Sequence, residues 1–208
     1  MKLIKIIIIL FLFATNLLSA QNDNNIKNDT NEFNSLLHQR IYQLNIGKHQ
    51  TLKLLEFKNG EFEGSLINSV FKMDRKNNLE LMTVKINVPV KTVKILMDEL
   101  KEKQFENIPD CREIKNCIDG TSSSFNTIHF TSITDAKFHK YYYWKTESDY
   151  NNKALSRETA QVRELLSIIN NEINLEKEFQ NFVSRLPIGK YTYDGIIITK
   201  KTRISFLD

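Results

Sequence analysis

The chain has 208 residues, with 29 Lys and Arg against 25 Asp and Glu, which gives a formal net charge of +4. This small basic excess is spread along the chain and is not the clustered basic surface that binds nucleic acid. The six glycines fit neither a G-x-G-x-x-G motif nor a P-loop, which excludes nucleotide binding through either. The four histidines cannot form H-E-x-x-H, and no serine has the glycine spacing of an α/β-hydrolase elbow.

The first 20 residues have the three parts of a secretory signal peptide. Lys2 and Lys5 precede an apolar run from Ile6 to Phe13, and small and polar residues lead to Ala20. The run is too short to cross a bilayer, which takes about 20 apolar residues. We therefore expect cleavage after Ala20 and a mature protein in the periplasm or outside the cell. An uncleaved signal anchor is the alternative.

The segment that follows the signal is polar. Residues 21–31, QNDNNIKNDTN, show no apolar period, so we expect a disordered leader. Apolar residues then continue nearly to the end without a Pro-, Gly- or Ser-rich linker. We therefore expect one domain over residues 32–208, soluble and without a membrane span.

The first part of this domain reads as one helix and three strands. Apolar residues at helical spacing predict a short helix within residues 31–44. Apolar and polar residues alternate on both sides of Asn59-Gly60, which predicts a β-hairpin within residues 51–73. A third strand is predicted at residues 79–88.

The remainder alternates helices with strand pairs. Pro89 begins a predicted amphipathic helix, because proline suits the first helical turn. Hairpins joining most strands imply an α+β single domain, with a mainly antiparallel sheet and helices packed on one face. The expected elements are a helix at 89–105, a strand pair within 124–146 turning near Thr134, helices at 156–173 (N-cap Ser156) and 175–186, and a last strand pair around Asp194-Gly195.

The only two cysteines, Cys111 and Cys117, stand in the segment CREIKNC. In an oxidising compartment we expect them to form a disulfide, for which the chain-entropy model gives about 2.4 kcal/mol with a loop of seven residues. Reactive thiols are the alternative, although redox pairs favour C-x-x-C. Metal binding would need further soft ligands, and we expect no metal site and no cofactor.

The strand pair within 124–146 supplies the candidate site. A three-residue turn centred on Thr134 would set His129 opposite His139, with Tyr141 and Tyr143 on the same outward face. Two imidazoles and two phenols could bind a ligand or a partner. The adjacent Trp144 belongs to the same aromatic run, KYYYWK. The alternative is that these aromatics only pack in the sheet, as their high β-propensity would explain.

The stretch from Pro89 to Ile173 shows a pattern of helix, FENIPDC, a loop through CIDGTSSSFNTIHF, a hairpin, and a helix that ends in LLSIINNEIN. This pattern resembles uncharacterised domains of small exported bacterial proteins. The resemblance implies export and this order of elements, and it implies no activity.

Two classes of function remain. The first is a non-enzymatic binding or accessory module of the cell envelope, of inhibitor or immunity type, whose partner is another envelope or secreted protein. The second is a hydrolase-like or metal-binding enzyme that uses His129 and His139 with a carboxylate such as Asp119 or Asp135. The absence of the tested catalytic motifs favours the first.

Overall fold

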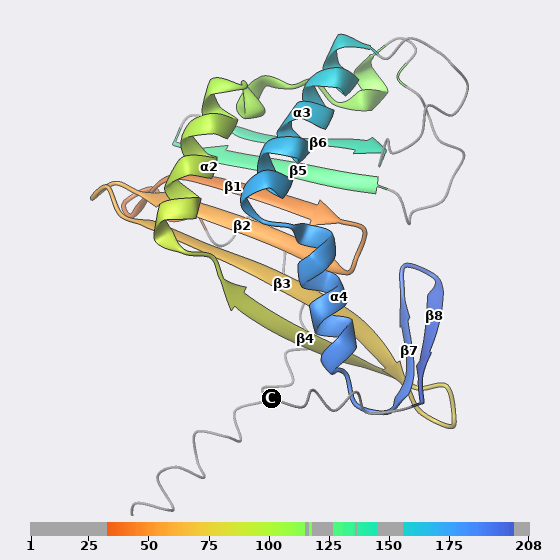
Figure 1. Ribbon diagram of the computed structural model, residues 1–208. Coiled ribbons are helices and arrows are strands. Elements are labelled where there is room, and N and C mark those ends of the chain that lie inside the picture. Colours follow the sequence, from red (N-terminus) through yellow and green to blue (C-terminus); the bar gives the residue numbers. More distant parts are fainter. Residues whose placement is uncertain (1–32, 115–116, 118–126, 136, 145–155, 202–208) are drawn as a thin grey trace, which may run out of the picture. The chain divides into compact units, whose positions relative to one another are not determined.

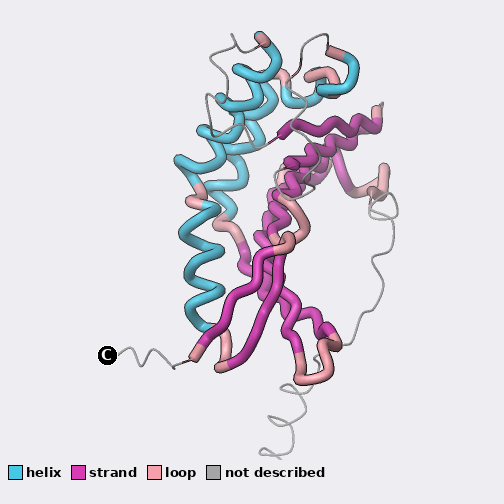
Figure 2. The backbone as a smooth tube through the Cα atoms, turned by 90° about the vertical axis from the view of Figure 1, so that its right-hand side faces the viewer, coloured by secondary structure: helices cyan, strands magenta, loops and turns pink. Residues whose placement is uncertain are grey.

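The computed structural model describes residues 33–114, 117, 127–135, 137–144 and 156–201. In these residues eight strands form one sheet, and three α-helices cover one of its faces, as Figures 1 and 2 show from two directions. The predicted fold class, an α+β domain with helices on one face, is confirmed. The predicted signal peptide (1–20) and leader (21–31) lie outside the described residues.

The sheet is antiparallel throughout, with the strand order β6-β5-β1-β2-β3-β7-β8, and β4 also pairs with β3. The strands are β1 (His38–Ile46), β2 (Gln50–Phe57), β3 (Phe62–Met73), β4 (Leu79–Asn87), β5 (Thr127–Thr134), β6 (Phe138–Trp144), β7 (Gly189–Tyr193) and β8 (Ile196–Lys200). The helices are α2 (Val90–Glu102), α3 (Arg157–Glu172) and α4 (Leu175–Arg185), with 3-10 turns η2 (Phe105–Asn107) and η3 (Cys111–Glu113).

The prediction of a helix within residues 31–44 is wrong, because strand β1 begins at His38. This strand is central: Leu44 lies opposite Leu52 of β2 on one side and opposite Phe130 of β5 on the other. Apolar and polar residues alternate from Tyr42 to Ile46, as in a strand, and residues 40–44 are buried on both faces. Strand β1 pairs with β2 and with β5, so it joins the predicted strands within residues 51–88 to the predicted strand pair within 124–146 in one sheet.

The other predicted elements are confirmed, with ends shifted by a few residues. Pro89 precedes the first residue of α2 as its N-cap, without a side-chain cap. Ser156 caps α3, since its side chain accepts a hydrogen bond from the backbone N–H of Thr159 at 3.1 Å. The turns at Asn59-Gly60 and Asp194-Gly195 connect β2 to β3 and β7 to β8.

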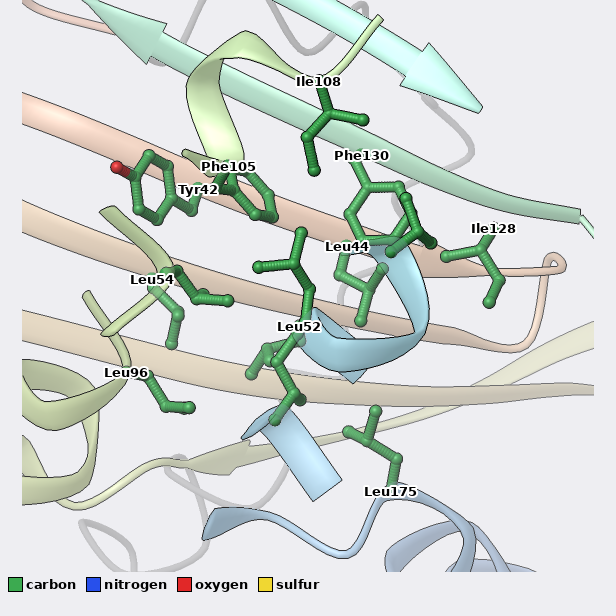
Figure 3. Close-up of a cluster of buried hydrophobic side chains, with 14 of the residues drawn as sticks. Tyr42, Leu44, Leu52, Leu54, Leu96, Phe105, Ile108, Ile128, Phe130 and Leu175 are labelled. Atoms are coloured by element: carbon green, nitrogen blue, oxygen red, sulfur yellow. The ribbon is translucent and has the colours of Figure 1, made fainter. Parts of the chain in front are cut away.

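The main core lies between the sheet and helices α2 and α3. Four residues of α2 at helical spacing are fully buried: Val93, Leu96, Met97 and Leu100. Figure 3 shows leucines of β1 and β2 in this cluster together with Phe105 of η2 and Phe130 of β5. Helix α2 comes close to β3 at Gly64, where an added Cβ would lie 2.5 Å from Val93 Cγ2.

A second cluster lies beneath α4. Phe179 and Phe182 of this helix pack with Val70 of β3 and Tyr191 of β7, which holds the β7–β8 hairpin under the helix. Among the described residues, no helix is long and apolar enough to cross a membrane.

Candidate functional site

The two cysteines form the predicted disulfide, with Cα atoms 5.5 Å apart. Cys111 is buried in the main core, while Asp110 caps η3 by accepting a hydrogen bond from the backbone N–H of Arg112 at 2.8 Å. Burial alone would raise the pKa of the Asp110 carboxyl, but hydrogen bonds from Arg112 outweigh it and hold that pKa below its usual value. The polar segment after the disulfide, residues 118–124, lies outside the described residues.

The predicted register of the β5–β6 hairpin is wrong. His129 lies opposite Tyr142, and His139 lies opposite Ser132. The backbone N–H of Thr134 donates to the carbonyl of Lys137 at 2.9 Å, so two residues separate the paired ends. The expected three-residue turn would pair His129 with His139, but His129 pairs with Tyr142, three positions further along β6. Because this shift is odd, each β6 side chain lies on the face opposite to the predicted one. His129 and His139 therefore lie on opposite faces of the sheet.

Three alternate residues of β6 face the helices and bind the chain just before the disulfide. Tyr141 and Tyr143 are almost fully buried, and burial raises the pKa of both hydroxyl groups. They do not form the outward face that the sequence suggested. The hydrogen bonds run from His139 Nε2 to the Ile108 carbonyl (2.7 Å), from Tyr141 Oη to the Phe105 carbonyl (2.9 Å) and from Tyr143 Oη to the Pro109 carbonyl (2.8 Å).

His129 lies on the other face, beside Tyr142, with ring centroids 6.1 Å apart. The Arg112 guanidinium covers the Tyr142 ring at 4.7 Å. Burial, and then the positive charge of Lys140, lower the pKa of His129. The Asp110 carboxylate acts in the opposite direction, but burial and Lys140 outweigh it, so the pKa of His129 is lowered.

The remaining predicted site residues are dispersed. Asp135 pairs with Lys58 at 2.7 Å on the surface. Asp119 and the side chain of Trp144 lie outside the described residues. Within the described part of the chain, no three His, Cys, Asp or Glu residues form a group that could hold a metal ion. The expectations of no metal and no cofactor stay predictions.

A buried charged cluster lies near the start of β1. The Arg40 guanidinium contacts Glu56 at 2.9 Å and Glu106 at 3.0 Å, although neither contact is aligned as a hydrogen bond. The Tyr42 hydroxyl donates to Glu106 at 2.6 Å. Burial, and then this hydrogen bond, raise the pKa of Tyr42. The cation lies between two carboxylates and ties η2 to β1, although Arg40 Nε and Glu56 Oε2 have no hydrogen-bond partner.

At the other end of β1, a cavity of about 650 Å³ lies between the sheet and the junction of α3 with α4. A volume of this size is typical of small-molecule sites. Its apolar side chains come from both layers, and its rim includes the exposed residues Ser167, Asn170 and Glu176. The lining residues are Ile46, His49, Gln50, Ile128, Arg163, Leu166, Ser167, Asn170, Leu175 and Glu176.

Hydrogen bonds connect one wall of this cavity to the other and fix the helix junction. The Gln50 amide nitrogen donates to the carbonyl of Leu175, the first residue of α4, at 2.7 Å. The same nitrogen donates to Asn68 Oδ1 of β3 at 2.9 Å. The Asn170 side chain accepts a bond from the backbone N–H of Leu175 at 3.3 Å. The α3–α4 junction, which forms one wall of the cavity, is therefore fixed to the sheet, which forms the other.

A histidine–carboxylate pair lies beside the cavity. His49, in the β1–β2 turn, contacts an Asp194 carboxylate oxygen through Nδ1, and the other oxygen accepts the backbone N–H of Lys48 at 2.9 Å. The Asp194 side chain is only 4% exposed. The His49 ring packs against Phe179 and Tyr193, with centroids 4.5 Å and 5.3 Å away. The ring is thus fixed in position while it lines the cavity.

No sequence motif indicates this site. In the sequence Asp194 is one residue of a predicted turn, and His49 is one of four histidines. No local pattern connects two residues 145 positions apart. The pair becomes visible only when the β7–β8 hairpin is placed beside the β1–β2 turn (Figure 1).

Comparison with known proteins finds no family model that matches this chain and no curated protein that is similar to it.

Proposed function

We propose that the protein is exported and acts as a binding or accessory module of the cell envelope, with the cavity beside His49 as its binding site. The ligand is a small molecule, or a group presented by another envelope or secreted protein, that combines an apolar part with a polar head. We propose neither a nucleic acid nor a cofactor as a ligand.

The observation that carries the proposal is the combination of an aliphatic wall with a polar rim in one cavity. Ile128 of β5 and Leu166 of α3 line it, while Arg163 and Glu176 add charges of both signs. Pockets that combine apolar walls with a few oriented polar groups are the usual form of ligand sites. The predicted signal peptide and the disulfide support export, because disulfides persist in oxidising compartments.

The alternative, a hydrolase-like or metal-binding enzyme built on His129 and His139, has less support. It depended on a shared face, and the β5–β6 register sets the two imidazoles on opposite faces. His139 Nε2 also forms a hydrogen bond with the carbonyl of Ile108.

A fluorescence titration with Nile red, whose emission rises in apolar surroundings, tests the binding site. Ser167→Trp should fill the cavity and weaken dye binding by roughly tenfold, about 1.4 kcal/mol. Asn171→Trp is the matched control, since Asn171 is also exposed on α3 but does not line the cavity. Equal loss in both variants, or no saturable binding to the unchanged protein, would contradict the proposed site.

Export is tested separately by the mass of the protein recovered from outside the cytoplasm. The proposal predicts an N-terminus at Gln21. A protein that keeps Met1 and stays with the cells would contradict cleavage after Ala20.

A further inference from the structure

We propose that Asp194 and His49 make the cavity selective for apolar ligands that donate a hydrogen bond, such as a phenol or an alcohol, with His49 Nε2 as the acceptor. This inference rests on the proposed function, because it names the ligand class of the same cavity.

The contact between the two side chains fixes the tautomer of His49. A carboxylate oxygen can only accept, so Nδ1 must carry the hydrogen that lies between them. A neutral imidazole has a single N–H, which leaves a lone pair on Nε2. The Asp194 carboxylate is also fixed as an acceptor on its second oxygen, by the N–H of Lys48.

The surroundings direct this lone pair to the ligand. His49 lines the cavity, whereas Asp194, which contacts Nδ1, does not, so Nε2 is the ring nitrogen left for a ligand. A ring flip that exchanged the two nitrogens would break the bond to a carboxylate that is 4% exposed. Phe179 and Tyr193 pack against the ring and oppose other movements.

The four apolar lining residues favour a ligand with an apolar body. Ile46 and Ile128 from the sheet face Leu166 and Leu175 from the helices around the same space. A ligand with an aromatic or alkyl body can bury it against these side chains. Its hydroxyl then donates to His49 Nε2, while an ether of the same shape would leave the acceptor without a partner.

Two probes, para-propylphenol and its methyl ether para-propylanisole, in which O–CH₃ replaces the donor O–H, test the inference by calorimetric titration at mildly alkaline pH. The unchanged protein should bind the phenol roughly 3- to 10-fold more tightly, the ratio expected of one net hydrogen bond. In Asp194→Asn the amide can donate to Nδ1, which would leave the hydrogen on Nε2. The preference for the phenol should then be lost or reversed, and ¹⁵N spectra of the histidine ring should show the hydrogen moved.

The control is Asp135→Asn, which changes an exposed aspartate just after β5 and should leave the preference unchanged. If Asp194→Asn does not fold, His49→Phe keeps an aromatic ring against Phe179 and should bind both probes equally. Equal affinity of the unchanged protein for both probes, or a neutral His49 protonated on Nε2, would overturn the selectivity while leaving the cavity as a binding site. Saturable binding of neither probe would contradict the proposed function as well.

Discussion

His49 and Asp194 contact each other although 145 residues separate them in the chain. The two turns that carry them have backbone suited to the contact, with positive φ of 53° at Gly47 and 44° at Asp194. A side chain at position 47 would collide with the Asp194 carboxylate. The β1–β2 and β7–β8 turns therefore fit together as a pair, and this fit places His49 at the cavity.

Replacing Asp194 by alanine should lower the free energy of unfolding by about 1–3 kcal/mol, because the N–H of Lys48 and Nδ1 of His49 would lose a buried acceptor. Denaturant unfolding measures this change. Asp135→Ala is the comparison, since that aspartate makes an exposed ion pair with Lys58 and should cost less than about 1 kcal/mol. Equal losses in the two variants would show that the Asp194 contact adds no more stability than an exposed ion pair.

Replacing Gly64 by alanine should destabilise the protein by about 1–3 kcal/mol, because the new Cβ would lie 2.5 Å from Val93 Cγ2. Adding Val93→Ala to this variant removes the colliding methyl group. The double variant should therefore be more stable than the sum of the two single losses predicts. Additive losses in a double-mutant cycle would contradict the close approach of α2 to β3.

Hairpins and amphipathic helices could be predicted because each has a local cause. Asn59-Gly60 specifies a turn, and the spacing from Val93 to Leu100 gives α2 one apolar face. Strand β1 was missed although apolar and polar residues alternate from Tyr42 to Ile46, because the apolar spacing over residues 31–44 also fits a helix. Its pairing with β5 joins segments far apart in the chain, which no local pattern encodes.

The site was harder to predict than the fold. The register of β5 with β6 depends on whether two or three residues form the turn, and aromatic residues on both faces of β6 leave its buried face ambiguous. On this strand Phe138 is 51% exposed, whereas Tyr141 is fully buried. The cavity depends on where α3 and α4 lie over the sheet, which no motif specifies.

Replacing both Cys111 and Cys117 by alanine should cost about 2 kcal/mol of stability, the chain-entropy value for this short loop. Affinity for Nile red should not change, because neither cysteine lines the cavity. Thermal unfolding of the oxidised protein and of the variant measures the difference. Alkylation of both cysteines in unreduced protein, seen by mass, would contradict the disulfide.

Stability should fall as the pH rises above about 10. Burial raises the pKa of Tyr42, Tyr141 and Tyr143 in the folded protein, whereas an unfolded tyrosine ionises near pH 10. Above that pH the unfolded chain binds fewer protons than the folded one, so the free energy of unfolding decreases by about 1.4 kcal/mol per pH unit for each protected tyrosine. In one pH titration, tyrosinate absorbance measures the ionisation of the tyrosines and circular dichroism measures unfolding. Full ionisation of all tyrosines in a protein that stays folded would contradict their burial.

We predict that the cavity between the sheet and the α3–α4 junction binds a ligand. Titration of para-propylphenol into ¹⁵N-labelled protein, followed through backbone amide shifts, tests it most directly. We predict saturable shifts that are largest at lining residues, including Ile46, Gln50, Ser167 and Leu175. Shifts that do not saturate, or that centre on the disulfide end of the sheet around Cys111, would contradict it.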